Sequence, residues 1–577
     1  MKSLDYKIPS WLHFGKSSSV SYASGMIMLL TMVLTYCVAT VGWLVGLTVT
    51  AFIIPVGFLS ACAIVARCAT RCCFLWAVSV NIVSWLIFTT VSAMICDYSW
   101  DGIAYHQVTV YALADDWNPV WDASYTNWLS LWSKHYACGL ELISSCIFRM
   151  TGNLESGKAV NLLFGLASFL ICLDVVRRVR PGFSKSFAFL LTLIAVSNPV
   201  WICQTFTFYI DYAMYFYILM TMVFSIEIVN GHNVKLSRIG LAGMILLAIG
   251  TKFNHFFMEG VTVVAILGWL MISGKKAVAW SVFKLSALSA LTGAVVLAFH
   301  PYVTNWITQG NPFYPLMGEG AIDIMTCNTP DMYSGHGRLV NFVLSVYGPV
   351  SFPLFDSRVS GFGPLFKFLF TVCVVIIAIS EIRNKRMSVT GYVAACVLGS
   401  CFLFEQSWWA RYNPQTWMIV PLALYAVSGW EKGIGRVCGL WTVGILATIN
   451  VAVSSVLPIM DGLRMTVYRN TVFEVFSGRH VRAHVGDIWA EKLSSHGVMA
   501  EVVDENAIPE EKRISLLYVP EYGTIRYIWL EADADDKAKI DSLYKNHPIC
   551  VSRNNLVEFG ESAYRSMKSK LGWKSSD

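Results

Sequence analysis

The chain has 577 residues, of which 55% are hydrophobic and only 14% are charged, and its formal net charge is +6. A soluble domain of this size carries far more charge, so the composition excludes a soluble globular protein. It predicts a polytopic membrane protein. In such a protein, the positions of the basic residues along the chain indicate the topology, which the net charge does not. The sixteen cysteines show no metal-ligand spacing, and most lie in apolar runs where they act as small hydrophobic residues.

The apolar runs divide the chain into about 13 transmembrane helices, counting about 20 apolar residues for each span. A polar stretch precedes the first run, so a cleaved signal peptide is not expected. The predicted spans are 26–45, 46–66, 74–96, 158–177, 186–203, 211–229, 237–251, 256–273, 280–299, 362–381, 388–404, 415–430 and 437–457.

Basic residues gather on every second loop, from Arg67 and Arg71 after the first hairpin to Lys432 and Arg436 before the last span. The positive-inside rule places these loops and the N-terminus in the cytoplasm. The opposite compartment then receives the loops 97–157, 204–210, 252–255, 300–361 and 405–414, together with the tail after about residue 458.

The first large outer loop begins with an acidic and aromatic segment, residues 97–119, directly after an apolar run. Acids at a bilayer surface neither anchor a helix nor attract anionic lipid, so they favour chemistry or cation binding there. In a helix, Asp101 would share a face with Tyr105 and lie beside His106. Asp97, Asp115 and Asp116 are interpreted as structural acids, the last two as caps or turn residues. Short helices along the interface are expected from the aromatic spacing of Trp121, Tyr125, Trp128, Leu129 and Trp132.

Further polar residues mark the other outer segments. Asp211 lies at the mouth of a span, where it is either a second functional acid or a helix cap. Lys252, Arg358 and Arg411 oppose the positive-inside bias, so each should meet an anion. That anion is either a phosphate or a protein carboxylate such as Glu259, Glu405 or a loop acid. His300 and Asn305, in an ordered Pro-rich and aromatic turn, are candidates to bind sugar or phosphate oxygens, or to serve as structural donors.

After Pro458 the chain becomes richer in charge. Alternating segments at 514–520 and 524–531 flank a Pro-Glu-Tyr-Gly turn and predict strands, and residues 485–496 and 534–546 predict helices. The predicted domains are therefore 1–73 (cytoplasmic N-terminus and an additional hairpin), 74–457 (a transmembrane module with outer loops 97–157 and 300–361) and 458–577 (a small extracytoplasmic α/β domain).

These motifs, in this order and on one side of the membrane, resemble those of the GT-C superfamily of integral-membrane glycosyltransferases. They are Asp-x-x-x-Tyr-His at 101–106, Asp211 at a helix mouth, Gly-Thr-Lys-Phe at 250–253, Asn-Pro-Phe-Tyr-Pro-Leu at 311–316 and Ala-Arg-Tyr-x-Pro at 410–414. The resemblance covers roughly residues 74–430 and is strongest to bacterial members related to protein mannosyltransferases and the lipid A aminoarabinose transferase. The hairpin 26–66 has no counterpart in that family, and we expect it outside the bundle.

The resemblance implies a sugar donor on polyprenyl phosphate and a glycolipid, glycan or protein acceptor, on the outer face of a bacterial inner membrane. It implies that Asp101 is the catalytic base or a metal ligand, with Asp211 as the second acid. Lys252, Arg411 and Arg358 would then face the donor phosphate. Asp101, Asp211 and His106 are candidate ligands of a divalent metal ion, although no cofactor is assigned, and no nucleic-acid partner is expected.

Two other functions fit many spans and a large outer loop. A polymerase or ligase of lipid-linked glycans would use a diphosphate-linked donor and a site dominated by arginines. A transporter or flippase would place charges at the membrane midplane near broken helices. Most predicted spans lack interior charges, which favours the glycosyltransferase.

Overall fold

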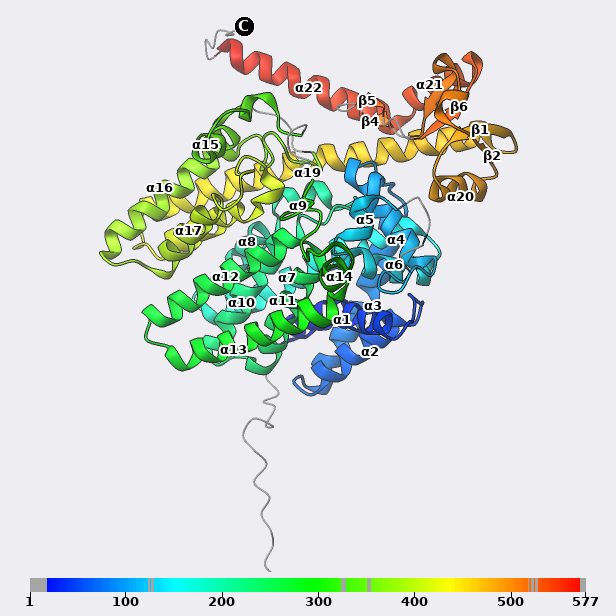
Figure 1. Ribbon diagram of the computed structural model, residues 1–577. Helices are drawn as coiled ribbons and strands as arrows, with labels where there is room; N and C mark the ends of the chain where they lie inside the picture. Colours follow the sequence, from blue (N-terminus) through cyan, green and yellow to red (C-terminus); the bar gives the residue numbers. More distant parts are fainter. Residues whose placement is uncertain are drawn as a thin grey trace, which may run out of the picture.

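The computed structural model describes residues 18–122, 125, 129–322, 328–349, 354–516, 518–519, 523–524 and 528–570. Most of these residues form a bundle of helices, and a small α/β domain lies beyond the far end of the long helix α19 (Figure 1). The protein is therefore mostly helical, with one small sheet system near its C-terminus.

Within the described residues, eight helical segments are long and apolar enough to cross a membrane. They are α1 (Val20–Leu44), α3 (Arg71–Ala93), the segment Leu154–Val179 (η3, Leu154–Lys158, and α7, Ala159–Val179), α10 (Ala213–Asn230), α11 (Val234–Thr251), α12 (Phe253–Ile272), the segment Lys276–Leu297 (α13, Lys276–Thr292, and η4, Gly293–Leu297) and α19 (Ile434–Phe476).

The other five expected spans also contain helices, but these are shorter or more charged. They are α2 (Ile53–Ala66), α8 (Lys185–Val196) with α9 (Pro199–Gln204), α16 (Phe366–Asn384), α17 (Val389–Ser400) and η8 (Pro414–Met418) with α18 (Ile419–Ser428). The break between α8 and α9 has a local cause, since the Asn198 side chain caps Val200 N–H at 2.9 Å and Pro199 opens the new helix. An integral membrane protein is supported, and thirteen crossings stay a prediction.

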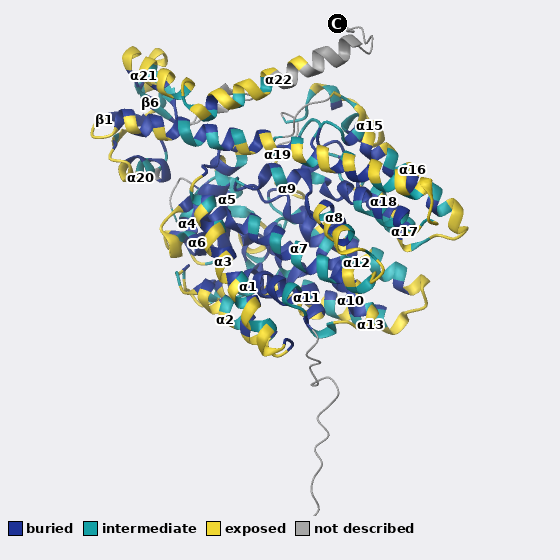
Figure 2. Cartoon of the chain, turned by 180° about the vertical axis from the view of Figure 1, so that it is seen from behind, coloured by how far each residue is buried: buried dark blue, intermediate teal, exposed yellow. Residues whose placement is uncertain are grey.

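The helix α1 corrects one expectation. The first hairpin was expected outside the bundle, but α1 lies inside it, with two thirds of its most apolar stretch buried (Figure 2). Gly25 permits this position, because a Cβ there would stand 2.8 Å from the Ala167 carbonyl oxygen of α7. The second helix of the pair, α2, keeps a largely exposed face, with Val56 and Leu59 among its exposed residues.

Short elements build the outer loops. The first loop holds η2 (Gly102–His106), α4 (Gln107–Ala114), α5 (Leu131–His135) and α6 (Gly139–Thr151), so short helices occur in it. Of the described aromatic and apolar residues that suggested them, however, only Trp132 lies in a helix. Asp115 caps the C-terminus of α4 and Asp116 has a φ of +65°, as expected of cap and turn residues. Trp128 lies outside the described residues. Later loops hold η5 (Phe299–Val303), α14 (Thr304–Gln309), η6 (Asp331–Tyr333), α15 (Arg338–Tyr347) and η7 (Ala410–Tyr412).

The helix α19 joins the bundle to the C-terminal domain. A span was expected at 437–457, but α19 continues through Pro458 to Phe476, so it both belongs to the bundle and supports the domain (Figure 1). Buried residues on its second half, including Met465 and Phe476, belong to the same hydrophobic cluster as the sheet residues. Packing against the domain thus sustains the helix beyond the proline.

The C-terminal domain has a four-stranded sheet in the order β2-β1-β6-β3, in which β1 and β2 are parallel and the other neighbours antiparallel. Strands occur in both expected segments and helices at both expected places, whereas β1, β2 and α22 were not foreseen. Part of the expected turn, residues 520–522, lies outside the described residues. The elements are β1 (His480–His484), α20 (Asp487–Ser495), β2 (Met499–Val502), η9 (Glu505–Ala507), η10 (Glu510–Lys512), β3 (Arg513–Ser515), β4 (Tyr518–Val519), β5 (Gly523–Thr524), β6 (Trp529–Glu531), α21 (Ala534–Lys545) and α22 (Pro548–Lys570).

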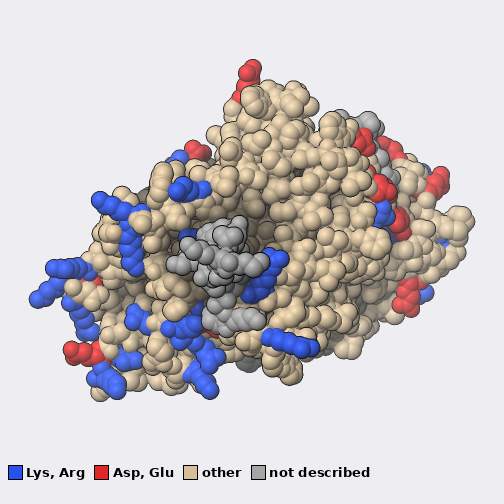
Figure 3. Space-filling view, turned by 90° about the horizontal axis from the view of Figure 1, so that it is seen from below, with Lys and Arg blue, Asp and Glu red and all other residues tan. Residues whose placement is uncertain are grey.

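Charged residues are unevenly spread over the surface. In the view from below, most visible Lys and Arg side chains gather on the left, the side on which α12 and α13 turn in Figure 1 (Figure 3). The exposed residues Lys275, Lys276, Lys385, Arg386 and Lys432 lie in loops that were predicted to be cytoplasmic. Acidic side chains in this view lie mainly toward the opposite side (Figure 3).

Candidate functional site

Arg411 is the centre of a cluster of charges contributed by five separate segments. Its Nη1 lies 2.8 Å from Asp101 Oδ2, 3.2 Å from Asp356 Oδ1 and 3.6 Å from Asp211 Oδ2. Lys252 Nζ donates to Asp211 Oδ1 at 2.7 Å, and Arg358 pairs with the other oxygen of Asp356. We call these six residues the Arg411 cluster, which holds three acids and three bases.

Helix ends place these side chains. Asp101 is the residue before η2, and Asp211 lies in the turn before α10. Lys252 is the single extended residue between α11 and α12, with φ −164° and ψ 146°. Arg411 lies in the 3₁₀ turn η7, shortly before Pro414 starts the next turn. These four charges therefore lie at or next to helix ends, whereas Asp356 and Arg358 lie in the loop between α15 and α16.

Aromatic rings surround the guanidinium of Arg411. Its Cζ lies 4.2 Å from the ring centre of Trp409, 5.0 Å from Tyr209 and 5.5 Å from Tyr412. Lys252 Nζ lies 5.6 Å from the Tyr412 ring, and Arg358 lies over Trp409 at 4.9 Å. Stacking on aromatic faces adds cation–π attraction and limits the movement of each base.

Burial and neighbouring charges act in opposite directions on the pKa values of three members of the cluster. Burial raises the pKa of Asp211, but Lys252 and Arg411 outweigh it and the pKa ends below its ordinary value. Burial lowers the pKa of Lys252, but Asp211 more than restores it. For Asp356, burial raises the pKa despite the opposing effect of Arg411 and Arg358. Burial and the charge of Asp101 together raise the pKa of Tyr105 well above its ordinary value, so its hydroxyl stays protonated.

Asp101 is the most accessible acid of the cluster. Its side chain is 18% exposed, against 1% for Asp211 and 4% for Asp356. The two buried acids are enclosed by their basic partners, whereas Asp101 has a single salt-bridge partner, Arg411, within the described residues. Of the three, Asp101 is the carboxylate that an incoming molecule can reach.

A small pocket opens beside Lys252, with an empty volume of about 300 Å³ that includes space open to solvent. Tyr136, Phe253, Tyr302, Phe313 and Leu316 are among its lining residues, so its walls are mainly aromatic and apolar. The predicted Asn-Pro-Phe-Tyr-Pro-Leu motif therefore forms one wall of this pocket. A cationic residue at one side of an apolar pocket suits a ligand with an anionic group and an apolar or ring-shaped part.

Three other predicted site residues lie apart from the cluster. His106 packs behind Tyr105, with ring centroids 4.1 Å apart, and its Nδ1 lies 2.6 Å from buried Glu141. Asn305 contacts His135 at 2.7 Å and donates to the Tyr314 carbonyl at 2.9 Å, so it supports the pocket wall from behind. His300 contacts Thr304 at 3.2 Å, and burial lowers its pKa to about 3. Each has a protein partner that accounts for its burial.

Sequence reasoning missed Asp356, the partner of both arginines, and the aromatic residues Tyr209, Tyr136, Trp409 and Tyr412. A signal for Asp356 was available, since it lies two residues before Arg358, a base on the unexpected side that needed an anion. The two carboxylates suggested as alternative partners do not pair with Lys252 or Arg411 in the described residues. Glu259 accepts a hydrogen bond from Thr221, and Glu405 lies 3.7 Å from Arg338.

Asp101, Asp211 and His106 were predicted as possible ligands of a divalent metal ion. Within the described residues, no group of three or more His, Cys, Asp or Glu side chains is arranged to hold a metal ion. Asp101 and Asp211 both bind Arg411, so a divalent cation between them would have to displace its guanidinium. The side chain of His106 is engaged by Glu141 instead.

Comparison of the chain with known proteins gave no match. No protein-family model matches it, and neither the curated proteins nor the solved structures contain a match. Any functional conclusion must therefore come from the residues and geometry of the Arg411 cluster and its pocket.

Proposed function

We propose that the protein is an integral-membrane glycosyltransferase of the GT-C type, which transfers one sugar from a polyprenyl phosphate to a glycolipid, glycan or protein acceptor. The observation that carries the proposal is the accessible acid Asp101 held by Arg411, together with a second base, Lys252, which pairs with the neighbouring Asp211 and lines an apolar pocket. This arrangement supplies a base for the acceptor and cations for a phosphate leaving group.

The proposed reaction balances without any nucleotide. Asp101 takes the proton of the acceptor hydroxyl or amine, whose oxygen or nitrogen forms a bond to the anomeric carbon of the sugar. The bond between that carbon and the phosphate oxygen breaks, and polyprenyl phosphate leaves with the electron pair. Lys252 and Arg411 stabilise the charge that develops on the phosphate.

The pairing of Asp101 with Arg411 is consistent with a site to which no sugar donor is bound. A phosphate that binds Arg411 competes with Asp101 for the guanidinium, because both are anions within its reach. Donor binding would then free the Asp101 carboxylate next to the acceptor. Arg358 can assist through Asp356, which it shares with Arg411.

The proposal includes the topology. We place thirteen spans in a bacterial inner membrane, with the N-terminus in the cytoplasm and the C-terminal domain outside. The gathering of Lys and Arg on the side where α12 and α13 turn supports this orientation (Figure 3). The cluster then lies at the outer ends of its helices, which argues against a transporter site at the midplane.

A lipid-linked sugar profile of a deletion strain tests the proposal. We expect a polyprenyl-phosphate sugar to accumulate, and plasmid-borne wild type and Asp116→Asn to clear it. Asp101→Asn should be expressed and folded yet leave the lipid in place. Clearance by Asp101→Asn would refute the assignment, accumulation of a diphosphate-linked oligosaccharide would indicate a polymerase or ligase, and uptake by proteoliposomes would indicate a transporter.

A further inference from the structure

One buried carboxylate, Asp97, joins the two loops that carry the acids of the proposed reaction. Its Oδ1 accepts from Ser99 N–H at 2.8 Å, and its Oδ2 accepts from Phe208 N–H at 2.9 Å. Asp97 is fully buried. It therefore makes no direct approach to a ligand, and its two oxygens are both committed to backbone donors.

Each of the two bonded amides lies a few residues before one of the acids in the sequence. Ser99 is two residues before Asp101, and Phe208 is three residues before Asp211. Ser99 lies directly before the helical turn that begins at Trp100, and residues 208–210 belong to no helix or strand, so a bond near each acid limits where the acid can lie. The Asp97 side chain therefore links the two loops close to both acids, beside the bond from Asp101 N–H to the Tyr209 hydroxyl.

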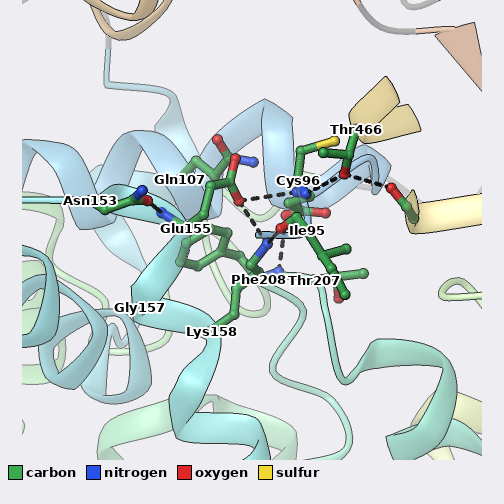
Figure 4. A network of polar contacts seen from close by, with 12 residues as sticks. Ile95, Cys96, Gln107, Asn153, Glu155, Gly157, Lys158, Thr207, Phe208 and Thr466 are labelled. Carbon is green, nitrogen blue, oxygen red and sulfur yellow. Dashed lines mark hydrogen bonds and ion pairs between the residues drawn. The ribbon is translucent and has the colours of Figure 1, made fainter. Parts of the chain in front are cut away.

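The backbone around Asp97 is itself anchored at three consecutive residues. Asp97 N–H donates to Glu155 Oε2 at 3.0 Å, Cys96 N–H donates to Thr466 Oγ1 at 2.9 Å, and the Ile95 carbonyl accepts from Lys158 (Figure 4). Glu155 is in turn held by Lys158 at 2.7 Å and by Arg469 of α19 at 2.8 Å. The backbone that carries the Asp97 carboxylate is therefore held by two helices, η3 and α19.

Little room is left around the Asp97 side chain. A Cβ placed on Gly102 would overlap the Asp97 carboxylate and the Ser99 hydroxyl, so glycine is required at the first residue of η2. A longer acid at position 97, such as glutamate, would also lack room beside Gly102 and Ser99. The geometry depends on the length of the aspartate as well as on its charge.

Charge also has to be balanced here. Asp97 and Glu155 lie with Lys158, Arg469 and Lys492, a set that we call the Glu155 cluster and that carries one positive charge in excess. Burial raises the pKa of Asp97, and Lys158 opposes that rise. Both carboxylate oxygens of Asp97 accept N–H hydrogen bonds. The ionised carboxylate therefore fits this site, because a protonated oxygen would itself be a donor.

We propose that Asp97 is a positioning residue for the transfer reaction, which sets the Asp101 loop against the Asp211 loop through its two backbone hydrogen bonds. The inference rests on the proposed function of Asp101 and Asp211. It assigns a task to an acid that the sequence alone placed among structural residues.

The experiment joins hydrogen exchange with turnover. In Asp97→Asn, one oxygen is replaced by an NH₂ group, so the amides of Ser99 and Phe208 should exchange about tenfold faster or more, as expected when a hydrogen bond to a charged acceptor is lost. In membranes holding the accumulated donor lipid, kcat should fall about 100-fold, the scale of a misplacement near 1 Å. The donor KM should change little, because Lys252 and Arg411 keep their mutual contacts with Asp211 and Asp356.

Three variants separate position from charge and from folding. Asp97→Glu keeps the charge but not the length, and should be impaired as well. Asp97→Asn with Lys492→Met restores the original charge excess and should stay slow. Asp116→Asn, an exposed acid of the same loop, should leave both amides and turnover unchanged.

Two outcomes would contradict the positioning role. Normal turnover in Asp97→Asn, or unchanged exchange at Ser99 and Phe208 in that variant, would each overturn the inference. Full activity of Asp101→Asn would instead refute the proposed function, while the exchange data would still report on the two hydrogen bonds.

Discussion

The Arg411 cluster and the Glu155 cluster are both assemblies of buried charges, yet they are built differently. In the Glu155 cluster, the acids bind backbone N–H groups as well as bases. In the Arg411 cluster, the acids bind mainly side chains, namely Arg411, Lys252 and Arg358. The first holds the backbone in place, and the second holds side chains that a ligand can exchange.

The two clusters also differ in how far their side chains are exposed to solvent. Within the Glu155 cluster, Lys158 is fully buried and Glu155 is 6% exposed. Within the Arg411 cluster, Asp101 is 18% exposed and Lys252 lines a pocket. Buried charge alone therefore does not identify a functional site in this protein. An accessible partner and an adjoining pocket are what separate the two clusters.

Replacing Arg411 should have the largest effect, because the residue serves both structure and ligand. Arg411→Met leaves Asp101, Asp211 and Asp356 without their shared base, which should cost about 3–5 kcal/mol of stability and abolish transfer. Arg411→Lys should not restore activity, since one ammonium cannot reach three acids and stack on Trp409. Thermal unfolding in detergent and clearance of the donor lipid measure the two effects. Transfer by Arg411→Met would contradict a role in phosphate binding.

Glu155→Gln should break the structural cluster. Removing this charge leaves Lys158 and Arg469 buried without their main anion, and about 3 kcal/mol or more of stability should be lost. The melting temperature in detergent measures the loss. Glu491→Gln is the matched control, because Glu491 is an exposed glutamate of α20 that contacts only Tyr111 among the described residues. Equal melting temperatures for the two variants would show that the Glu155 cluster is not a structural centre.

Arg358→Met should have an intermediate effect on the proposed reaction. Arg358 reaches the site through Asp356 and is 28% exposed, so the fold should tolerate its loss. The donor KM should rise about tenfold with kcat unchanged, the pattern of a lost binding contact to a charged group. Titration of donor lipid in membranes separates the two constants. A fall in kcat alone would place Arg358 closer to the chemistry than the structure does.

Lys492 should make stability depend on pH. Burial lowers its pKa to about 8, while the unfolded side chain has a pKa of about 10.4. Between these values the unfolded state binds more protons, so the wild type should gain stability relative to Lys492→Met as the pH rises from 8 to 10. Below pH 8 both states bind the proton and the difference should be constant. Melting temperatures of both proteins across this range test it, and parallel curves would contradict it.

The smallest effect is expected at Asp116. It pairs with Arg149 at 2.9 Å on the surface, where both side chains are more than 40% exposed. Asp116→Asn should change stability by less than about 1 kcal/mol, as is typical of exposed pairs. Melting temperature and lipid clearance should match those of the wild type. A large loss in either would mean that exposure is a poor guide to function in this loop.

The sequence by itself determined the broad class of protein and most of the charged residues of the candidate site. Apolar runs and loop charges indicated a helical membrane protein, because burying charge in lipid is costly wherever the chain runs. The same cost singled out Asp101, Asp211, Lys252 and Arg411, which the structure brings into one cluster. Loop composition likewise indicated an α/β C-terminal domain. All of these are local properties, readable within about 20 residues.

The tertiary structure alone decided which residues meet. Asp101 and Arg411 are 310 positions apart, and nothing in either segment names the other as its partner. The burial of α1, the continuation of α19 beyond Pro458 and the bond from Asp97 to Phe208 depend in the same way on how helices pack. Sequence patterns reveal that a buried charge needs a partner, but only the packed bundle determines which one lies within about 3 Å.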